Sequence, residues 1–550
     1  MAESSVVLSM ISGSYFTNIL LLVVIIVSVI FFLSKKTNLP PGPWTLIPYI
    51  GFAPNIAYAL YKGEPLYKFL TKLGNKYGQV YSFTALGMHI VVLNEYKAIR
   101  EAFQDIKLND RGENEMLVKI LGRTNNKWDD MGPYRIFALA CFRQFGVGTS
   151  RFEEPIRTES AYLVDELANL KGHPVDPTWH FNNAVSNIIC KVVFGTRFEL
   201  SDERFHRLTN LVNRQNELLG AGSLEILTPI NIPSKAKQEM NEVFNELLEF
   251  INGMIENHRQ NLDPDNLNDV IDLWLNEIRL HKSDDPNSFR HPDNMPGQIL
   301  LLFLAGTDTT SNTLRWGSQY LVRYPKVQDR IHREIDTVVG RNRLPKLADK
   351  LNLPYTQAVI AEFHRIISLV PLSSFHVAGD TTTFRGYTIP KNTVVFSNLY
   401  AVMHSPEIWG DPEEFRPERF LDDEGNFHEP DEVIPFGIGR RVCLGEALAR
   451  QELFIFFTHI LHQFKFEKTS EDAPMPTLKP IDGLVLHPEP YKLRVIKRDA
   501  TRAGILLFQL VLNFESNLLI FQLLSFCMEF CSYVRFVMLH AGYPCLLLKA

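Results

Sequence analysis

The chain has 550 residues, of which 45% are hydrophobic and 21% charged, and its formal net charge at pH 7 is −6. This composition is too apolar and too weakly charged for an intrinsically disordered protein, and the lack of net positive charge argues against a nucleic-acid-binding protein. Six cysteines in a chain of this length exclude a small disulfide-stapled scaffold.

The N-terminal segment is predicted to anchor the chain in a membrane. Residues 15–33 contain no charged side chain, and Lys35 and Lys36 follow directly. A helix of this length spans about 28 Å, close to the ~30 Å hydrocarbon core of a bilayer. By the positive-inside rule, residues 15–34 form a transmembrane signal anchor, residues 1–14 face the lumen and the rest of the chain is cytosolic. The alternative is a cleaved signal peptide, which is disfavoured because the segment lacks a basic n-region and a small-x-small cleavage site.

Residues 35–49 are predicted to be a basic and proline-rich hinge. Three prolines and a glycine between residues 39 and 43 exclude a helix or a central strand, so this segment is stiff and extended. Residues 50–498 contain no low-complexity linker and no internal repeat, and we expect them to form a single domain.

Helical periodicity dominates this domain, and strand-like patterns are few and short. Helices are predicted over residues 165–170, 236–258, 294–324, 326–339, 355–367 and 446–456. Strands are predicted over residues 80–83, 90–93, 384–389 and 393–397. Pro325 before one of these helices and Gly340 after it match the preferences of helix ends. The predicted fold class is mainly α with a small β component.

The first motif that indicates chemistry is the segment 436–445, which begins at Phe436 and contains Cys443 among glycines. Glycines let a backbone approach a flat partner closely. Arg440 and Arg441 precede the cysteine and a predicted helix follows it, and both features favour a thiolate. A cysteine thiolate is a known axial ligand of haem iron, whereas an isolated cysteine is usually an inert core residue.

The second motif, residues 305–310, lies in the middle of a long helix whose preceding turns are apolar on every side. Gly306 is predicted to open space for a ligand. Threonine hydroxyls can bond back to the carbonyl four residues earlier and loosen the helix. Asp308 and Thr309 could then pass protons to a bound oxygen species. The alternative interpretation is a helix kink with satisfied polar groups.

Two further motifs supply a carboxylate and arginines. Glu362 and Arg365 lie three residues apart and share one helix face, which by itself predicts an ordinary surface ion pair. Arg419 lies in the proline-marked loop 415–420. Each motif is weak alone, but the four motifs in this order are specific.

With these motifs, residues 39–498 resemble a cytochrome P450, a haem-thiolate monooxygenase, and in particular its animal microsomal branch. The resemblance rests on the segment around Cys443, on the motif 362–365 and on the proline hinge. It implies a cytochrome P450-like haem-thiolate fold that holds one haem, an iron protoporphyrin, through Cys443 as the proximal thiolate ligand.

The resemblance also implies roles for the other motif residues. Asp308 and Thr309 match the acid–alcohol pair that delivers protons in the family. The members of the family's buried structural triad are matched by Glu362, Arg365 and Arg419.

Three haem contacts follow from the same resemblance. Phe436 is expected to pack on the thiolate side of the haem, and Arg441 to pair with a propionate. His376 falls where related enzymes use histidine or arginine for a propionate. The alternative is that His376 is an ordinary histidine at a strand edge.

One part of the family pattern is irregular in this chain. The family carries Trp-x-x-x-Arg on its third major helix, and both side chains face a propionate. Arg135 takes the arginine position, but the tryptophan position falls on Met131, and Trp128 stands three residues earlier. Gly132 and Pro133 also fall at the expected helix start. Either the helix begins later and Trp128 reaches the haem from a loop, or one propionate contact is missing.

The resemblance implies an enzyme of the endoplasmic reticulum membrane that inserts one atom of O2 into a small lipophilic substrate, such as a steroid, a fatty acid or a xenobiotic. The chain lacks a glycine-rich nucleotide-binding motif, so electrons from NADPH must arrive through a separate protein. The resemblance points to NADPH–cytochrome P450 reductase, with cytochrome b5 as a second donor. A basic docking face could be formed by Arg143, Arg440, Arg441 and Arg450.

Two other functions are alternatives to a monooxygenase, and the motif residues disfavour both. A haem-thiolate isomerase or dehydratase of oxygenated lipids is disfavoured because Asp308 and Thr309 are both present. A non-catalytic haem-binding membrane protein is disfavoured because the segment around Cys443 is complete.

Residues 499–550 form an atypical apolar tail. Sequences of the family normally end soon after a strand such as residues 491–496. Polar residues between 509 and 517 interrupt the tail, so it offers no clean run of 18 apolar residues. It is either an interfacial helix pair or a translated extension without selected structure, and we favour the second interpretation.

Overall fold

The structure, a computed structural model, describes residues 17–18, 21–27, 29, 38–45, 49–111, 131–199, 201–221, 235–285 and 288–498. The predicted anchor and hinge lie partly outside these residues, and the tail 499–550 lies wholly outside them. Residues 21–27 are helical, and their apolar side chains are exposed. Among the described residues, no helix combines the length and the apolar character that a bilayer crossing requires.

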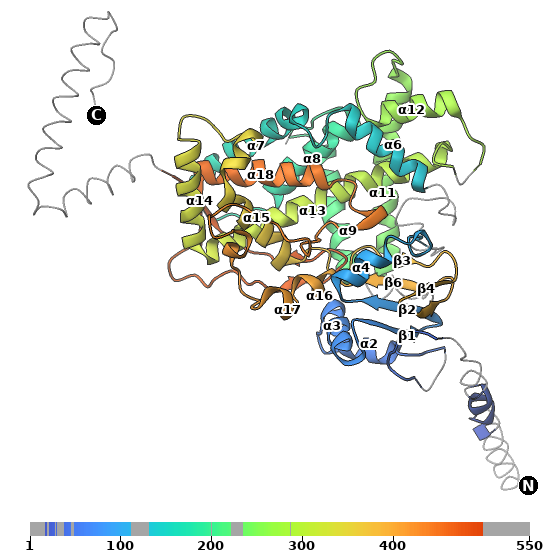
Figure 1. Cartoon of the computed structure of the whole chain (residues 1–550). Helices are drawn as coiled ribbons and strands as arrows, with labels where there is room; N and C mark the ends of the chain where they lie inside the picture. Colours follow the sequence, from blue (N-terminus) through green and yellow to red (C-terminus); the bar gives the residue numbers. More distant parts are fainter. Residues whose placement is uncertain are drawn as a thin grey trace, which may run out of the picture. The chain divides into compact units, whose positions relative to one another are not determined.

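Helices make up most of the described chain (Figure 1). The N-terminal half contributes α2 (Ala53–Tyr61), α3 (Leu66–Tyr77), α4 (Tyr96–Ala102), α6 (Met131–Gln144), α7 (Glu153–Asn169), α8 (Thr178–Phe194), α9 (Glu203–Ala221), α11 (Lys235–Asn261) and α12 (Val270–His281). The C-terminal half contributes α13 (Met295–Arg323), α14 (Pro325–Val338), α15 (Pro354–Ile367), α16 (Leu399–Met403), α17 (Pro406–Trp409) and α18 (Glu446–Gln463).

The strands form one small mixed sheet and three two-stranded ribbons. The sheet has the order β1-β2-β6-β3 and consists of β1 (Val80–Ala85), β2 (Met88–Leu93), β6 (Val394–Ser397) and β3 (His376–Val377). β2 runs parallel to β6, and the other two pairs are antiparallel. The ribbons pair β4 (Thr382–Phe384) with β5 (Tyr387–Ile389), β7 (Phe464–Glu467) with β10 (Arg494–Lys497), and β8 (Pro480–Ile481) with β9 (His487–Pro488).

The predicted fold class, mainly α with a small β component, is confirmed, and each predicted helix coincides with an observed one. The prediction of one strand over residues 384–389 is wrong. The segment holds the turn of the hairpin β4–β5, because Arg385 and Gly386 both adopt positive φ, at 49° and 82°. A strand cannot continue through two residues of left-handed conformation.

α13 is the central helix of the core. It packs on α8, α11, α15 and α18, and it buries polar side chains such as Ser311 and Asn312 as well as apolar ones such as Phe303. Gly317 permits its closest crossing, since a Cβ atom there would lie 2.3 Å from the ring of Phe457 on α18 and 3.0 Å from the ring of Phe363 on α15. This crossing fixes α13, which carries the second motif, against α18, which directly follows the first motif.

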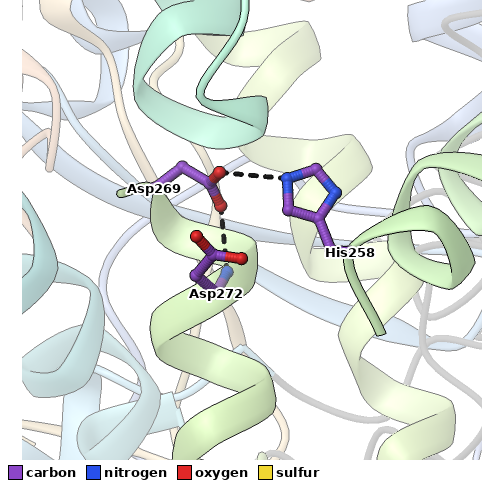
Figure 2. Close-up of side chains that lie close together, drawn as sticks. All are labelled: His258, Asp269 and Asp272. Atoms are coloured by element: carbon purple, nitrogen blue, oxygen red, sulfur yellow. Dashed lines mark hydrogen bonds and ion pairs between the residues drawn. The ribbon is translucent and has the colours of Figure 1, made fainter. Parts of the chain in front are cut away.

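A buried ion pair joins α11 to α12 (Figure 2). His258 Nε2 lies 3.0 Å from Asp269 Oδ2, and Asp269 Oδ1 accepts the backbone N–H of Asp272 at the start of α12. Burial disfavours the charged imidazolium, but the hydrogen bond and the charge of Asp269 outweigh it and raise the pKa of His258 to about 9. These three residues could also ligate a metal ion. However, they already bond to one another, so we interpret the cluster as a structural junction between the two helices.

This ion pair makes stability depend on pH. A pKa raised above the usual 6.5 means that the stabilisation is fully present below about pH 6.5 and is lost as the pH rises through about 9. We expect His258→Gln to lower the free energy of unfolding by about 2 kcal/mol at pH 6 and by much less at pH 9.5. Denaturant unfolding at both pH values measures this. His173→Gln removes an exposed histidine and serves as the control, and an equal loss at both pH values for His258→Gln would contradict the assignment.

Candidate active site

The segment around Cys443 is held by its backbone. Cys443 N–H donates to the carbonyl of Phe436 at 2.9 Å and closes the loop. Gly437 and Gly439 both have positive φ, at 72° and 82°. A Cβ atom on Gly439 would also lie 2.8 Å from the carbonyl oxygen of Phe103 at the end of α4. Glycine is therefore required at both positions, and the cysteine is presented directly before α18.

The Cys443 thiol lies inside the protein but faces an opening. The residue is exposed, yet burial is the largest influence on the thiol and raises its pKa above the ordinary value. The sulfur is therefore surrounded by protein although the residue stays accessible. A thiolate in such a position, directly before a helix, could ligate the iron of a haem.

The neighbours of Cys443 favour a thiolate but do not form one alone. The backbone N–H groups of Gly445 and Glu446 donate toward the sulfur and the guanidinium of Arg135 also lowers the thiol pKa, whereas the carboxylate charge of Glu446 raises it. The backbone groups and the arginine act in the predicted direction, although the arginine that acts is Arg135 rather than Arg440 or Arg441. Because burial outweighs them, a thiolate here needs a positively charged ligand such as a metal ion.

The second motif presents one open face of α13. Ala305 is exposed in the middle of a helix that is otherwise largely buried, and Thr309 lies one turn later on the same face. Thr309 Oγ1 donates to the carbonyl of Ala305 at 2.9 Å, as predicted for threonines in this motif. The prediction that Gly306 opens space for a ligand is wrong. A Cβ atom there would lie 3.0 Å from Ile189, so Gly306 serves the packing of α8 on α13.

Asp308 is engaged on both carboxylate oxygens. Asn312 Nδ2 donates to Oδ1 at 2.8 Å, and His487 Nε2 on β9 lies 3.1 Å from Oδ2. Both Asp308 and His487 are largely buried, with 13% and 14% of their side chains exposed. Asp308 and Thr309 are therefore adjacent on the helix, but the aspartate is held toward β9.

A cluster of cations lies beside the segment around Cys443 and includes the predicted Arg135 and Arg441, and the predicted His376 lies next to it. Arg135 donates to the carbonyl of Val442, Arg441 donates to Asn109 O at 3.1 Å, and His376 Nδ1 lies 3.2 Å from Leu108 O. The structure adds Arg111, which donates to the carbonyls of Ser374 and Phe375. These backbone contacts aim several guanidinium groups at one region.

The cations in this cluster repel one another. Burial lowers the pKa of Arg111 to about 9, and the charges of Arg441 and Arg135 lower it further. Burial and the charge of Arg111 lower the pKa of His376 to about 2, so this imidazole is neutral. Among the described residues the carboxylate that opposes this effect on Arg111 and Arg441 is Asp110. The cluster fits an anionic ligand with two carboxylates, such as the propionates of haem.

His376 lies at a strand edge, as one interpretation of the sequence predicts, whereas its contact with a propionate stays a prediction. It lies on β3, the edge strand of the sheet, where its ring stacks on Phe103 at 3.8 Å between centroids. Phe436 lies beside Cys443 through its backbone, and its ring contacts His364 at 5.3 Å and the Arg450 guanidinium at 5.0 Å. Trp128 and the segment 112–130 lie outside the described residues.

The carboxylate and arginines of the third and fourth motifs meet in the interior. Arg365 donates to both oxygens of Glu362, at 2.6 and 2.8 Å, and Arg419 Nε donates to Glu362 at 3.3 Å. Arg365 also donates to the carbonyl of Met403 at 2.9 Å. Glu362 and Arg365 are fully buried, so the ordinary interpretation as a surface ion pair is wrong. This triad joins α15 to the loop before the segment around Cys443.

Known proteins resemble this chain over nearly the whole of the domain that contains these residues. The sequence model of the family described as "Cytochrome P450" matches residues 40–495. The chain is 36% identical to "Cytochrome P450 2A10" of Oryctolagus cuniculus over 446 residues, which cover 79% of this chain and 88% of that protein. It is 34% identical to "Cytochrome P450 2U1" of Bos taurus over 490 residues, covering 84% and 90%. It is 35% identical to "Cytochrome P450 2B19" of Mus musculus over 500 residues, covering 88% and 100%.

The triad predicts a large loss of stability when its carboxylate is removed. Glu362→Gln leaves the fully buried Arg365 without its counter-charge, whereas Arg419 keeps its ion pair with Asp411 at 3.2 Å, and we expect a loss of about 3–5 kcal/mol in the free energy of unfolding. Glu418→Gln is the control, because Glu418 pairs with Arg330 at 2.9 Å on the surface and should cost less than about 1 kcal/mol. Equal losses in the two variants, measured by denaturant unfolding, would contradict the structural role of the triad.

Proposed function

The chain belongs to the cytochrome P450 family and is a monooxygenase of that family, and we propose that it acts on small lipophilic compounds at a membrane, with electrons from NADPH–cytochrome P450 reductase. One observation carries the proposal: the Cys443 thiol is surrounded by protein although its residue is accessible, and it lies directly before α18. Cytochrome b5 is proposed as a second electron donor.

We assign the haem to the space that Cys443 faces. Cys443 would ligate the iron, and the propionates would bind the cation cluster of Arg111, Arg135 and Arg441, with the neutral His376 beside them. Their negative charge would relieve the repulsion that lowers the pKa of Arg111. When bound, the haem supplies the activation of dioxygen, which no protein side chain provides.

Asp308 and Thr309 are proposed to handle the protons that the reduction of dioxygen consumes. The Thr309 hydroxyl donates to Ala305 O on the open face of α13 and can turn to donate into the internal space instead. Asp308 is the adjacent acid on the same helix, from which the hydroxyl would be resupplied. Thr309 is therefore proposed as the last proton donor of the chain.

Apolar side chains on α13 and before β3 support the proposed substrate class. On α13, the exposed Ala305 lies one turn after the half-buried Leu301. The segment before β3 contributes half-buried Val370 and Leu372. Apolar walls with few polar groups are typical of sites for lipophilic ligands. A steroid, a fatty acid or a xenobiotic meets this requirement.

The location is proposed to be the endoplasmic reticulum membrane, with the domain on the cytosolic side and residues 15–34 as the single-pass anchor. Support comes from aromatic side chains near the N-terminus. Trp44, Tyr49 and Tyr61 are 67%, 60% and 85% exposed, and exposed tryptophan and tyrosine are typical of membrane–water interfaces.

The docking face for the reductase is proposed to use Arg143 and Arg440, which are exposed. Arg441 and Arg450 are less suited to it than the sequence indicated. Arg441 bonds to Asn109 in the interior, and Arg450 forms ion pairs with Glu446 and Glu429. A partner with an acidic face would be attracted by the remaining basic side chains.

The proposed reaction is tested with labelled dioxygen. Purified protein in lipid vesicles is combined with the reductase, NADPH and 18O2, and a set of steroids and fatty acids is screened by mass spectrometry. We expect a product that carries one 18O atom and that requires both NADPH and the reductase. A product that forms without dioxygen and NADPH would instead indicate an isomerase or a dehydratase.

The assignment of Cys443 predicts loss of the cofactor in one variant. We expect Cys443→Ala to retain little or no haem, because the remaining contacts are electrostatic and lie at the cofactor's edge. Cys190→Ala, at a buried cysteine in α8, is the control and should retain it. Haem content per protein measures the difference, and equal content in both variants would contradict the assignment.

The assignment of Thr309 predicts uncoupled turnover. We expect Thr309→Ala to release more peroxide and less product per NADPH, because the last proton donor is missing. The ratio of peroxide to product should rise by about tenfold or more. Thr313→Ala is the matched control, since Thr313 Oγ1 bonds to the carbonyl of Thr309 at 3.0 Å one turn later. An unchanged ratio in Thr309→Ala, or an equal change in Thr313→Ala, would contradict the proton-donor role.

A further inference from the structure

The contact between His487 and Asp308 joins segments that are far apart in the chain. Asp308 belongs to the open stretch of α13, and His487 lies on β9 of the ribbon near the end of the domain. Their side chains approach to 3.1 Å between Nε2 and Oδ2. With 14% of the histidine and 13% of the aspartate exposed, the pair is largely shielded, but water still reaches it.

The backbone around His487 is clamped on α13, so this contact is built into the fold. Trp316 Nε1 donates to the carbonyl of Leu486 at 2.8 Å, directly before the histidine. Arg315 Nη2 lies 3.4 Å from the carbonyl of Pro488, directly after it. Leu486 N–H also donates to Leu369 O at 2.8 Å. Bonds on both sides therefore fix the position of the imidazole relative to Asp308.

The two oxygens of Asp308 meet partners of different chemistry. Oδ1 accepts from the amide of Asn312, whose own oxygen accepts from Arg315 Nη1 at 2.7 Å. An amide holds the carboxylate in place but does not exchange its proton at neutral pH. Oδ2 faces the His487 imidazole, a side chain that can both accept and donate a proton. The carboxylate is thus oriented from one side and open to proton exchange on the other.

We propose that His487 is a positioning and proton-relay residue that resupplies Asp308, an inference that rests on the proposed function. The imidazolium gives its Nε2 proton to Asp308 Oδ2 and becomes neutral. The resulting carboxylic acid passes a proton on toward Thr309 and becomes a carboxylate again. Water returns a proton to the imidazole, so each cycle moves one proton from solvent to the internal space, without any change in covalent bonds or redox state.

The charged surroundings of His487 are set by the two elements that pack on β9, which are α13 and β8. α13 contributes Asp308 and Arg315. The hairpin that contains β8 and β9 contributes Lys479, Asp482 and Glu489. Asp308 is the carboxylate in direct contact with the imidazole, so the proton has a defined acceptor.

Two variants of His487 separate a relay from a merely structural contact. His487→Gln keeps a side chain that can hydrogen-bond to Asp308 but cannot transfer a proton, whereas His487→Ala removes both abilities. A structural role predicts that the glutamine variant behaves like the wild type. A relay predicts that it is folded like the wild type but proton delivery is as poor as in the alanine variant.

Proton delivery is measured as peroxide released per NADPH oxidised, with the reductase, in lipid vesicles and without added substrate, from pH 6 to pH 9. We expect His487→Gln to release about threefold more peroxide per NADPH than the wild type throughout this range, because the glutamine side chain cannot pass on a proton. The matched control is His180→Gln, since His180 Nδ1 lies 2.9 Å from Glu166 with similar exposure. No change in His487→Gln, or an equal change in His180→Gln, would overturn the relay.

The contact itself is tested without turnover, by thermal unfolding. We expect His487→Ala to lower the melting temperature more than His487→Gln does. The double variant of His487→Ala with Asp308→Asn should lower the melting temperature by less than the sum of these two single variants. Additive shifts would overturn the contact. A wild-type protein that oxidises no NADPH with the reductase contradicts the proposed function as well as the relay, whereas normal wild-type turnover with an unaltered His487→Gln contradicts the relay alone.

Discussion

Positive charge buried without enough negative charge is the constraint that organises this domain. Arg111, Arg135 and Arg441 are directed by backbone carbonyls into one region, where burial lowers the pKa of all three. The charge of Arg135 lowers the pKa values of Arg111 and Arg441 further, and Asp110 opposes this only in part. Nearby, the Cys443 thiol is desolvated and requires a cation to ionise. A ligand with a metal ion at its centre and carboxylates at its edge satisfies both demands at once. Haem has this distribution of charge.

The scaffold around this region is fixed by features that have no chemistry of their own. Glu362 and Arg365 hold α15 to the loop near Arg419, and the close crossing at Gly317 fixes α13 against its neighbours. Positive φ at Gly437 and Gly439 sets the path of the loop that presents the cysteine. Because the interior is close-packed, such contacts transmit small displacements to the site, and they explain why the motifs extend well beyond the reacting groups.

The sequence predicted those parts of the structure that local patterns determine. α13 and α14 could be predicted because a helical pattern extends over many residues in each, and because Pro325 and Gly340 mark the two ends of α14. The hairpin at Arg385 was missed because only one of its two left-handed residues is a glycine. Gly306 was misinterpreted because a glycine shows that space is needed but not which neighbour needs it, here Ile189.

The candidate site divides in the same way. The cysteine, the acid–alcohol pair and the triad stand in recognisable motifs. Arg111 and His487 do not, since each acquires its role only through contacts with residues more than 170 positions away, such as Ser374 and Asp308. An alignment of homologues or a structure is needed to see such pairs.

The central claim is that Cys443 binds haem iron as a thiolate, and the carbon monoxide difference spectrum of the reduced, membrane-expressed protein tests it most directly. The strong electron donation of a thiolate shifts the Soret band of the carbon monoxide complex far to the red of that given by a neutral ligand. We predict this red-shifted band for the wild-type chain. A band at the position of histidine- or thiol-ligated haem, or the absence of haem from correctly folded protein, would contradict the account.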